Sequence, residues 1–155
     1  MINLKRILFI GFLVALLDQI IKEVVMSLLD FGQSIMVIHG FFNISLLGNT
    51  GGAFSIFDQH TFLLIIISFA IIYVLYRCFI VNKDINKRDS IIYGILFGGI
   101  CGNLFDRVFR GYVVDYLDFN LFGYNYPVFN FADICIVLSV FAIVILTYKG
   151  DKNGI

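Results

Sequence analysis

The chain has 155 residues, of which 60% are hydrophobic and 14% charged, with a formal net charge of zero. Soluble domains carry about 25% charged residues, so this composition excludes an ordinary soluble domain and indicates a membrane protein. A net charge of zero gives no electrostatic reason to expect a nucleic-acid partner.

A helix that spans a membrane needs about 20 mainly apolar residues, so a chain of this length has room for four spans. We predict one integral-membrane domain over residues 1–155. Its fold is all-α, with four transmembrane helices and a small β-rich extracytoplasmic segment between the first two helices. The predicted spans are residues 4–29, 61–81, 90–107 and 128–148, and the predicted β-rich segment is residues 34–57.

The first apolar run, ILFIGFLVALL (7–17), follows Lys5 and Arg6 and is similar to a secretory signal peptide. No cleavage site with small residues follows it, and helical periodicity continues through DQIIKEVVMSLL. This pattern predicts an uncleaved spanning helix. In the third span, Gly94, Gly98 and Gly102 form two overlapping GxxxG patterns, which allow a neighbouring helix to approach closely.

The ends of the predicted spans that lie on one side of the membrane carry eight basic residues. The ends on the other side carry two, Arg107 and Arg110. Because cytoplasmic loops are enriched in Lys and Arg, both termini are expected on the cytoplasmic side. The residues that decide this orientation are Lys5, Arg6, Arg77, Lys83, Lys87, Arg88, Lys149 and Lys152.

The segment 34–57 contains short β-branched and aromatic runs that are interrupted by glycines. This composition is typical of small strands and turns. We expect the segment to lie outside, against the outer leaflet. A sheet that rests on the membrane is favoured here over a platform above a binding site, and both remain open.

Four acids from separate segments reach the same predicted depth, near the outer interface. Asp18 lies 14 residues beyond Leu4, or roughly 21 Å along a helix, and the hydrocarbon layer is about 30 Å thick. The other three are Asp106, Asp115 and Asp133. An ionisable group at membrane depth costs on the order of 2.5–3.5 kcal/mol, which makes it a candidate for function.

Some of these acids also have a structural interpretation. Asp18 and Lys22 are spaced i,i+4 and can pair on one helix face. Asp106 lies beside Arg107 at a helix end and is interpreted as a structural partner. Asp133 has no basic residue within one turn, and Asp115 follows two valines, so these two acids are the stronger candidates for chemistry.

Two carboxyl groups in a partly dry site share a proton, because both cannot ionise easily. Such a pair can hydrolyse a peptide, with one member acting as base and the other as acid. The two histidines, His39 and His60, have no spacing that suggests a triad or a metal site. The three cysteines, in apolar runs, show no metal or disulfide spacing, so we predict no metal and no cofactor; they are Cys78, Cys101 and Cys135.

Five motifs in order resemble those of lipoprotein signal peptidase (signal peptidase II), a bacterial membrane aspartic peptidase. The resemblance covers nearly the whole chain. The motifs are DQIIK (18–22), NTGGAF (49–54), GNLFDR (102–107), GYVVD (111–115) and FNFAD (129–133). One position departs from the family pattern, since Gly52 stands where alanine is common.

The resemblance implies that Asp115 and Asp133 are the catalytic pair. It also implies a site-lining or substrate-binding role for five further residues and a structural role for three others. The first group is Asn49, Gly51, Asn103, Arg107 and Asn130, and the second is Asp18, Lys22 and Asp106.

The implied substrate is a prolipoprotein that carries a diacylglyceryl cysteine, cleaved just before that cysteine. The resemblance places the protein in the bacterial inner membrane, in contact with membrane lipids. The distribution of basic residues and the depth of the acids predict an active site near the outer leaflet, and we expect a monomer. Two alternatives remain: a small proton- or ion-coupled transporter that uses intramembrane acids, and an assembly protein that uses the GxxxG faces.

Overall fold

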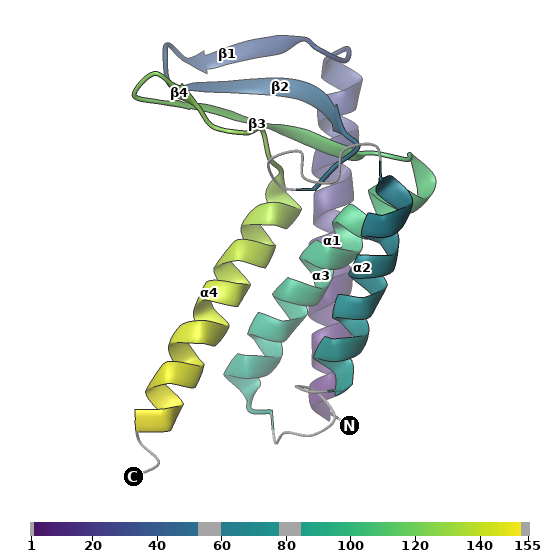
Figure 1. The fold of residues 1–155 in the computed structure, drawn as a ribbon, viewed down its shortest axis with the longest axis vertical. Helices are drawn as coiled ribbons and strands as arrows, with labels where there is room; N and C mark the ends of the chain where they lie inside the picture. The colour runs from purple at the N-terminus through teal and green to yellow at the C-terminus, as the bar shows by residue number, and fades with distance from the viewer. Residues whose placement is uncertain (1, 53–59, 78–84, 153–155) are drawn as a thin grey trace.

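The computed structural model describes residues 2–52, 60–77 and 85–152. Figure 1 shows helices that run side by side and a sheet that lies across one end of them. The helices are α1 (Ile2–Leu28), α2 (Thr61–Val74), α3 (Lys87–Phe109) and α4 (Phe131–Lys152). The sheet is antiparallel in the order β1-β2-β3-β4, with strands β1 (Ser34–Ile38), β2 (Phe42–Asn49), β3 (Val113–Leu121) and β4 (Tyr124–Asn125).

The sequence placed the helices correctly and missed part of the sheet. The expectation that β structure is confined to residues 34–57 is wrong, because residues 113–125, expected to form a simple link, provide β3 and β4. Of the predicted segment, residues 53–57 lie outside the described residues, as do residues 78–81 of the second predicted span.

The helix bounds differ from the predicted ones because capping residues decide them. The side chain of Asn86 accepts a hydrogen bond from the backbone N–H of Asp89, so α3 begins at Lys87. Likewise α4 begins only after Asn130, three residues later than expected.

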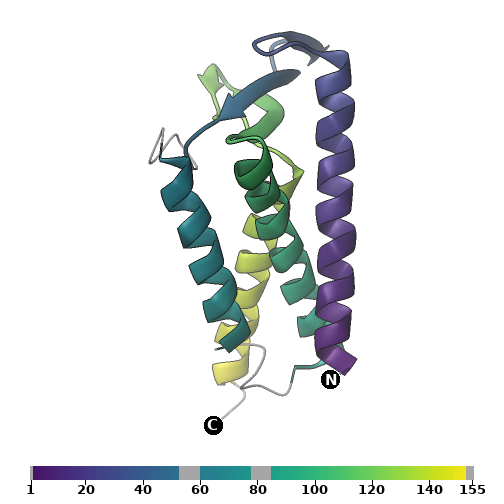
Figure 2. The ribbon, with the colours of Figure 1, turned by 90° about the vertical axis from the view of Figure 1, so that its right-hand side faces the viewer.

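Helix α3 is the centre of the bundle and contacts each of the other three helices. In Figure 2 it lies between α1 and α2. The predicted close approach at the GxxxG stripe is confirmed. A Cβ atom on Gly98 would lie 2.6 Å from the carbonyl oxygen of Gly11 in α1, and one on Gly102 would lie 2.6 Å from a carboxylate oxygen of Asp18. Glycine therefore brings the acid of α1 against α3.

The outer surface of the helices is apolar. The exposed fractions of Phe12, Phe69 and Phe141 are 61%, 57% and 65%, and such surface is typical of contact with lipid. By length and composition, two helices within the described residues can cross a membrane, Lys87–Phe109 and Phe131–Tyr148, and the apolar helix Thr61–Arg77 is shorter. The prediction of four spans stays a prediction.

A small apolar core fixes the sheet to the end of α1. It consists of Val25, Leu29, Leu46, Val114 and Tyr116. Because side chains alternate between the faces of a strand, burial of Val114 and Tyr116 in this core turns the side chain between them, Asp115, to the opposite face.

Candidate active site

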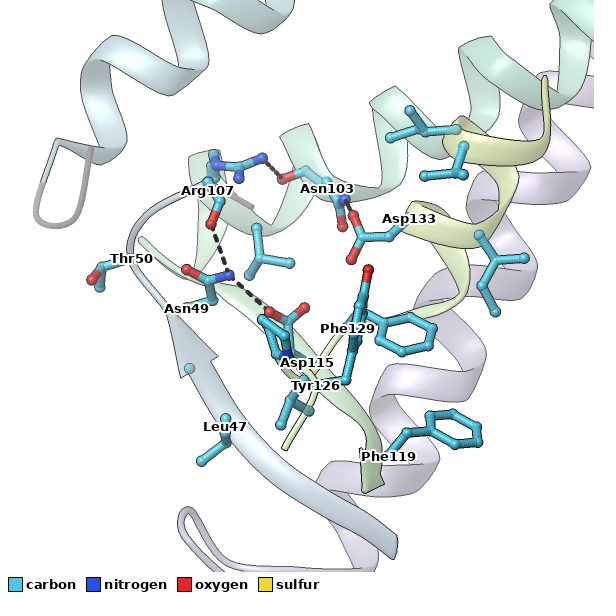
Figure 3. Close-up of a pocket in the computed structure, with 18 of the residues that line it drawn as sticks. Leu47, Asn49, Thr50, Asn103, Arg107, Asp115, Phe119, Tyr126, Phe129 and Asp133 are labelled. Carbon is cyan, nitrogen blue, oxygen red and sulfur yellow. Dashed lines mark hydrogen bonds between the residues drawn. The ribbon is translucent and has the colours of Figure 1, made fainter. Parts of the chain in front are cut away.

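A cavity of about 1070 Å³ lies between the sheet and α4. Figure 3 shows that Asp115, from β3, and Asp133, from α4, both point into it. Part of the wall is polar, and the remainder is apolar, with side chains from β3, α4 and the segment between them. The polar lining residues include Asn49, Asn103 and Arg107, and the apolar ones include Phe119, Val128, Ile134, Val137 and Leu138.

The first turn of α4 holds Asp133 in place. The Asp133 carboxylate accepts a hydrogen bond of 3.1 Å from the backbone N–H of Asn130, and the Asn130 side-chain oxygen accepts one of 3.0 Å from the backbone N–H of Asp133. This reciprocal pair is a capping box, which satisfies two of the free N–H groups at the helix start. The FNFAD motif therefore fixes both the start of α4 and the direction of Asp133.

Asn130 also contacts the second acid. Its side-chain amide donates to one oxygen of Asp115 at 2.6 Å, and the amide of Asn49 donates to the other oxygen at 2.8 Å. Asn49 is the last residue of β2 and pairs with Val113 of β3. One asparagine thus connects the two carboxyl groups, and the end of β2 supports one of them.

Asn103 of α3 completes the polar wall. Its amide nitrogen donates to Asp133 at 2.7 Å, and its amide oxygen accepts from Asn130 at 3.2 Å. Within the part of the chain that the structure describes, each acid therefore accepts two N–H hydrogen bonds, and three asparagines provide these donors.

Burial and the neighbouring Asp133 raise the pKa of the Asp115 carboxyl to about 7, although the amide hydrogen bonds from Asn49 and Asn130 oppose this rise. Only 3% of Asp115 is exposed. Near neutral pH this carboxyl is therefore present both with and without its proton, so it can take up a proton or release one.

Gly51 and Arg107 meet at the edge of the cavity. The guanidinium group of Arg107 donates to the carbonyl oxygen of Gly51 at 3.1 Å, and the backbone N–H of Gly51 donates to the side-chain oxygen of Asn49 at 2.9 Å. The second contact leaves the Asn49 amide nitrogen free to face Asp115. The Nε of Arg107 is buried and has no hydrogen-bond partner among the described residues.

Behind the cavity wall lies a buried ionic cluster. The ammonium group of Lys22 lies 2.7 Å from Asp18 and 2.8 Å from Asp106, and none of these three side chains is exposed. The predicted pairing of Asp18 with Lys22 is confirmed. Asp106 pairs with Lys22 and Arg110 and not with its neighbour Arg107, because a residue four positions away shares a helix face and an adjacent one does not.

Sequence reasoning missed two members of this cluster. The amide of Gln19 donates to Asp106 at 3.1 Å and to the carbonyl oxygen of Gly102 at 3.2 Å. Arg110 donates to the Gln19 side-chain oxygen at 2.8 Å and also contacts Glu23. The i,i+4 spacing of Asp106 and Arg110 predicts that these two residues pair. The role of Gln19 depends on how α1 and α3 pack, which the sequence does not show.

Within the described residues, no group of three or more His, Cys, Asp or Glu side chains could hold a metal ion. Of the cysteines, Cys101 and Cys135 are free thiols, and Cys78 lies outside the described residues.

Residues 10–149 match the family model described as signal peptidase (SPase) II. The chain belongs to the signal peptidase II family. It is 34% identical over 146 residues to the lipoprotein signal peptidases of Staphylococcus aureus strains MRSA252 and JH9, a match that covers 94% of this chain and 90% of each relative.

Two solved structures of bacterial membrane enzymes also resemble this signal peptidase II. One, determined at 2.3 Å by the in meso method, has a TM-score of 0.86 and 34% identity and covers 96% of this chain and 91% of its own. The other, at 1.9 Å, has a TM-score of 0.81 and 34% identity and covers 92% of each chain. The protein is thus a membrane-embedded signal peptidase of lipoprotein processing, and neither the transporter nor the assembly-protein alternative is favoured.

Proposed function

We propose that the protein is an aspartic endopeptidase that removes the signal peptide from diacylglyceryl-modified prolipoproteins, with Asp115 and Asp133 as its catalytic pair. Cleavage falls just before the lipid-modified cysteine. One observation carries the proposal: Asn130 contacts both carboxyl groups at once, through its side chain and its backbone N–H, in the wall of a large cavity.

The pair works with one member ionised and the other protonated. The ionised carboxylate takes a proton from a water molecule, whose oxygen attacks the scissile carbonyl carbon. The protonated carboxyl donates its proton to the carbonyl oxygen, which gives a neutral gem-diol intermediate. When this intermediate collapses, the C–N bond breaks, one carboxyl protonates the leaving amine, and the other recovers the proton of the diol hydroxyl. A pKa of about 7 for Asp115 supports this exchange of roles.

The remaining site residues orient the pair and the substrate. Asn49, Asn103 and Asn130 aim N–H donors at the two acids. Arg107 lines the cavity beside Gly51 and donates to a carbonyl group of the substrate. Asp18, Lys22 and Asp106 support the site from behind.

The shape of the cavity suits a lipid-modified peptide. Apolar side chains of α4 line it, and two of them, Val137 and Leu138, are also 64% and 62% exposed on the outer surface of the helix. Acyl chains can therefore extend from the cavity along α4 into the surrounding lipid, while the peptide bond next to the modified cysteine lies at the two acids.

The topology follows from the same arrangement. Helix α1 begins and α4 ends at the end of the bundle opposite to the sheet (Figure 1). With the basic helix ends on the cytoplasmic side, the single domain spans the bacterial inner membrane four times and keeps both termini in the cytoplasm. The sheet and the two acids then lie near the outer leaflet. We propose that the protein acts as a monomer in contact with membrane lipids.

The test is cleavage of a diacylglyceryl-modified prolipoprotein by purified protein in lipid, with the unmodified prolipoprotein as substrate control. Asp115→Asn and Asp133→Asn should each lower the cleavage rate by at least about 10³-fold, as expected when an acid–base catalyst is lost. Asp118→Asn is the matched control, because Asp118 lies on the same strand and contacts Ser45 and Asn43 instead of the cavity. Cleavage by a folded Asp115→Asn or Asp133→Asn protein at the rate of Asp118→Asn would refute the proposed dyad.

A further inference from the structure

Lys22 lies behind the cavity wall, between the carboxylates of Asp18 and Asp106, and does not line the cavity. Its ammonium group has three hydrogens and three acceptors, which are Asp18, Asp106 and the side-chain oxygen of Asn103 at 3.0 Å. The side chain is completely buried. A fully paired ammonium group at the junction of three polar side chains restricts the orientation of each one.

The two carboxylates that bind Lys22 also hold the backbone next to each proposed catalytic acid. Asp18 accepts a hydrogen bond of 3.1 Å from the backbone N–H of Ala132, the residue before Asp133. Asp106 accepts one of 3.1 Å from the backbone N–H of Val114, the residue before Asp115. Lys22 therefore connects the start of α4 and the start of β3.

The third contact of Lys22 sets the direction of an amide. An ammonium group only donates hydrogen bonds, so Asn103 must present its oxygen to Lys22, and its nitrogen must then face Asp133. If the amide were reversed, its oxygen would face a carboxylate oxygen and its nitrogen would face the Lys22 ammonium group. The present orientation favours the ionised form of the acid that it contacts.

We propose that Lys22 is a positioning residue of the catalytic pair, which acts through the Asn103 amide and through the backbone contacts of Asp18 and Asp106. This inference rests on the proposed dyad and extends it to a residue outside the cavity. Its consequence concerns pH: Lys22 keeps one member of the pair ionised at a pH at which two buried acids alone would both be protonated.

Other charged groups near Asp115 and Asp133 also affect the protonation of this pair. The positive charge of Lys22 lowers the pKa of Asp115, against the larger effect of burial. Arg107 is the second cation next to the pair, whereas Arg110 is engaged by Asp106 and Glu23. Near the sheet, the acidic and basic groups on the elements packed around the pair are Asp18, Lys22 and Glu23 from α1, Asp106 and Arg107 from α3, Arg110 directly after α3, Asp115 and Asp118 from β3, and Asp133 from α4. The other charged residues of these helices belong to the turns at the opposite end of the bundle; they are Lys5, Arg6, Lys87, Arg88, Asp89, Lys149, Asp151 and Lys152.

The experiment is the pH profile of kcat/KM and kcat for cleavage of the diacylglyceryl-modified prolipoprotein, with the protein in lipid. Lys22→Met should move the acidic limb of both profiles to higher pH by about one unit, because the ionised acid loses a positive charge and an oriented donor. KM should change little, since Lys22 does not line the cavity. A purely structural defect would lower activity by the same factor at every pH and would leave the limb in place.

Two further variants keep the test decisive. Lys22→Met leaves the buried Asp18 carboxylate without a cation, whereas Asp106 keeps Arg110. The double variant Lys22→Met/Asp18→Asn removes one charge of each sign and so preserves the charge balance of the cluster. It should also show a shifted limb. Gln19→Met is the matched control, because Gln19 contacts the same cluster but none of the three asparagines. Its limb should stay at the wild-type pH.

An unshifted limb in the folded double variant, or an equal shift in Gln19→Met, would overturn the role of Lys22. Failure of the proposed function is a separate result, because it appears as cleavage by Asp115→Asn or Asp133→Asn.

Discussion

Replacement of Asp115 by asparagine should change how the stability of the protein depends on pH. The pKa of this carboxyl is about 7 in the folded protein, whereas aspartate in an unfolded chain titrates near 3.9. Between these values the folded state holds a proton that the unfolded state has released, so the free energy of unfolding falls as the pH rises. At 1.36 kcal/mol for each pKa unit, the wild type should lose about 4 kcal/mol between roughly pH 4 and pH 7 through this group, and Asp115→Asn should not.

The measurement is the melting temperature of both proteins in the same detergent at intervals from pH 4 to pH 8. At 2–4 °C for each kcal/mol, the advantage of the wild type over Asp115→Asn should shrink by about 10 °C as the pH rises over this range. Leu117→Ala is the control, because it removes packing on the same strand and no titratable group, so its offset should not depend on pH. A difference between wild type and Asp115→Asn that is constant, or that grows with pH, would refute the view that burial disfavours the charged form of Asp115.

Two further predictions concern glycine geometry. Gly102→Ala places a methyl group 2.6 Å from a carboxylate oxygen of Asp18, and this overpacking, worth about 1–3 kcal/mol, should outweigh the gain in helix propensity of up to about 1 kcal/mol. Gly98→Ala makes a comparable clash with a backbone carbonyl farther from the site. Both variants should therefore lower the melting temperature, but only Gly102→Ala should shift the pH profile of cleavage. Identical pH profiles for the two variants would contradict this prediction. At the β3–β4 turn, Phe122 has a positive φ of 55° and is fully exposed, so Phe122→Gly should raise the free energy of unfolding by about 1 kcal/mol. Gly123→Ala, at φ 87°, should lower it, and a melting temperature that falls in Phe122→Gly would show that the turn is not strained.

The helices could be predicted from the sequence because long apolar runs depend on local composition alone. Their bounds depend on single capping contacts. At α4, Asn130 and Asp133 bond to each other's backbone N–H groups, and the spacing N-x-x-D was visible in FNFAD. The sequence analysis uses only the acid of this motif and does not treat the motif as a helix start. The predicted span therefore begins three residues too early.

The sequence predicts a simple link in place of β3, although this segment has the alternation of a strand. In VVDYLDFNL, Val114 and Tyr116 enter the core, while Val113, Asp115 and Phe119 line the cavity. This alternation is the ordinary signal of a half-buried strand. Its pairing partner, β2, lies more than 60 residues earlier in the chain, and pairing at that distance has no local signature.

The ionic cluster was predictable only in part. The i,i+4 spacing of Asp18 and Lys22 predicts their contact, but the contacts of Lys22 with Asn103 and Asp106 join residues more than 80 positions apart. The GxxxG stripe predicts part of this arrangement, because it indicates that a helix packs closely against α3. It did not indicate which helix, or that Gly102 faces Asp18.

The energetics of burial explain what this cluster contributes. Replacing a buried ion pair with apolar residues of similar volume is often neutral or even stabilising, because removing two charges from water is costly. Stability alone therefore does not account for Lys22, Asp18 and Asp106 at zero exposure. Apolar side chains could fill the same volume, but they could not accept the N–H groups of Ala132 and Val114 or hold the Asn103 amide in one direction. These contacts all end at a residue beside Asp115 or Asp133, or at an amide bonded to one of them, so the charges behind the cavity wall account for the position of the two acids in front of it.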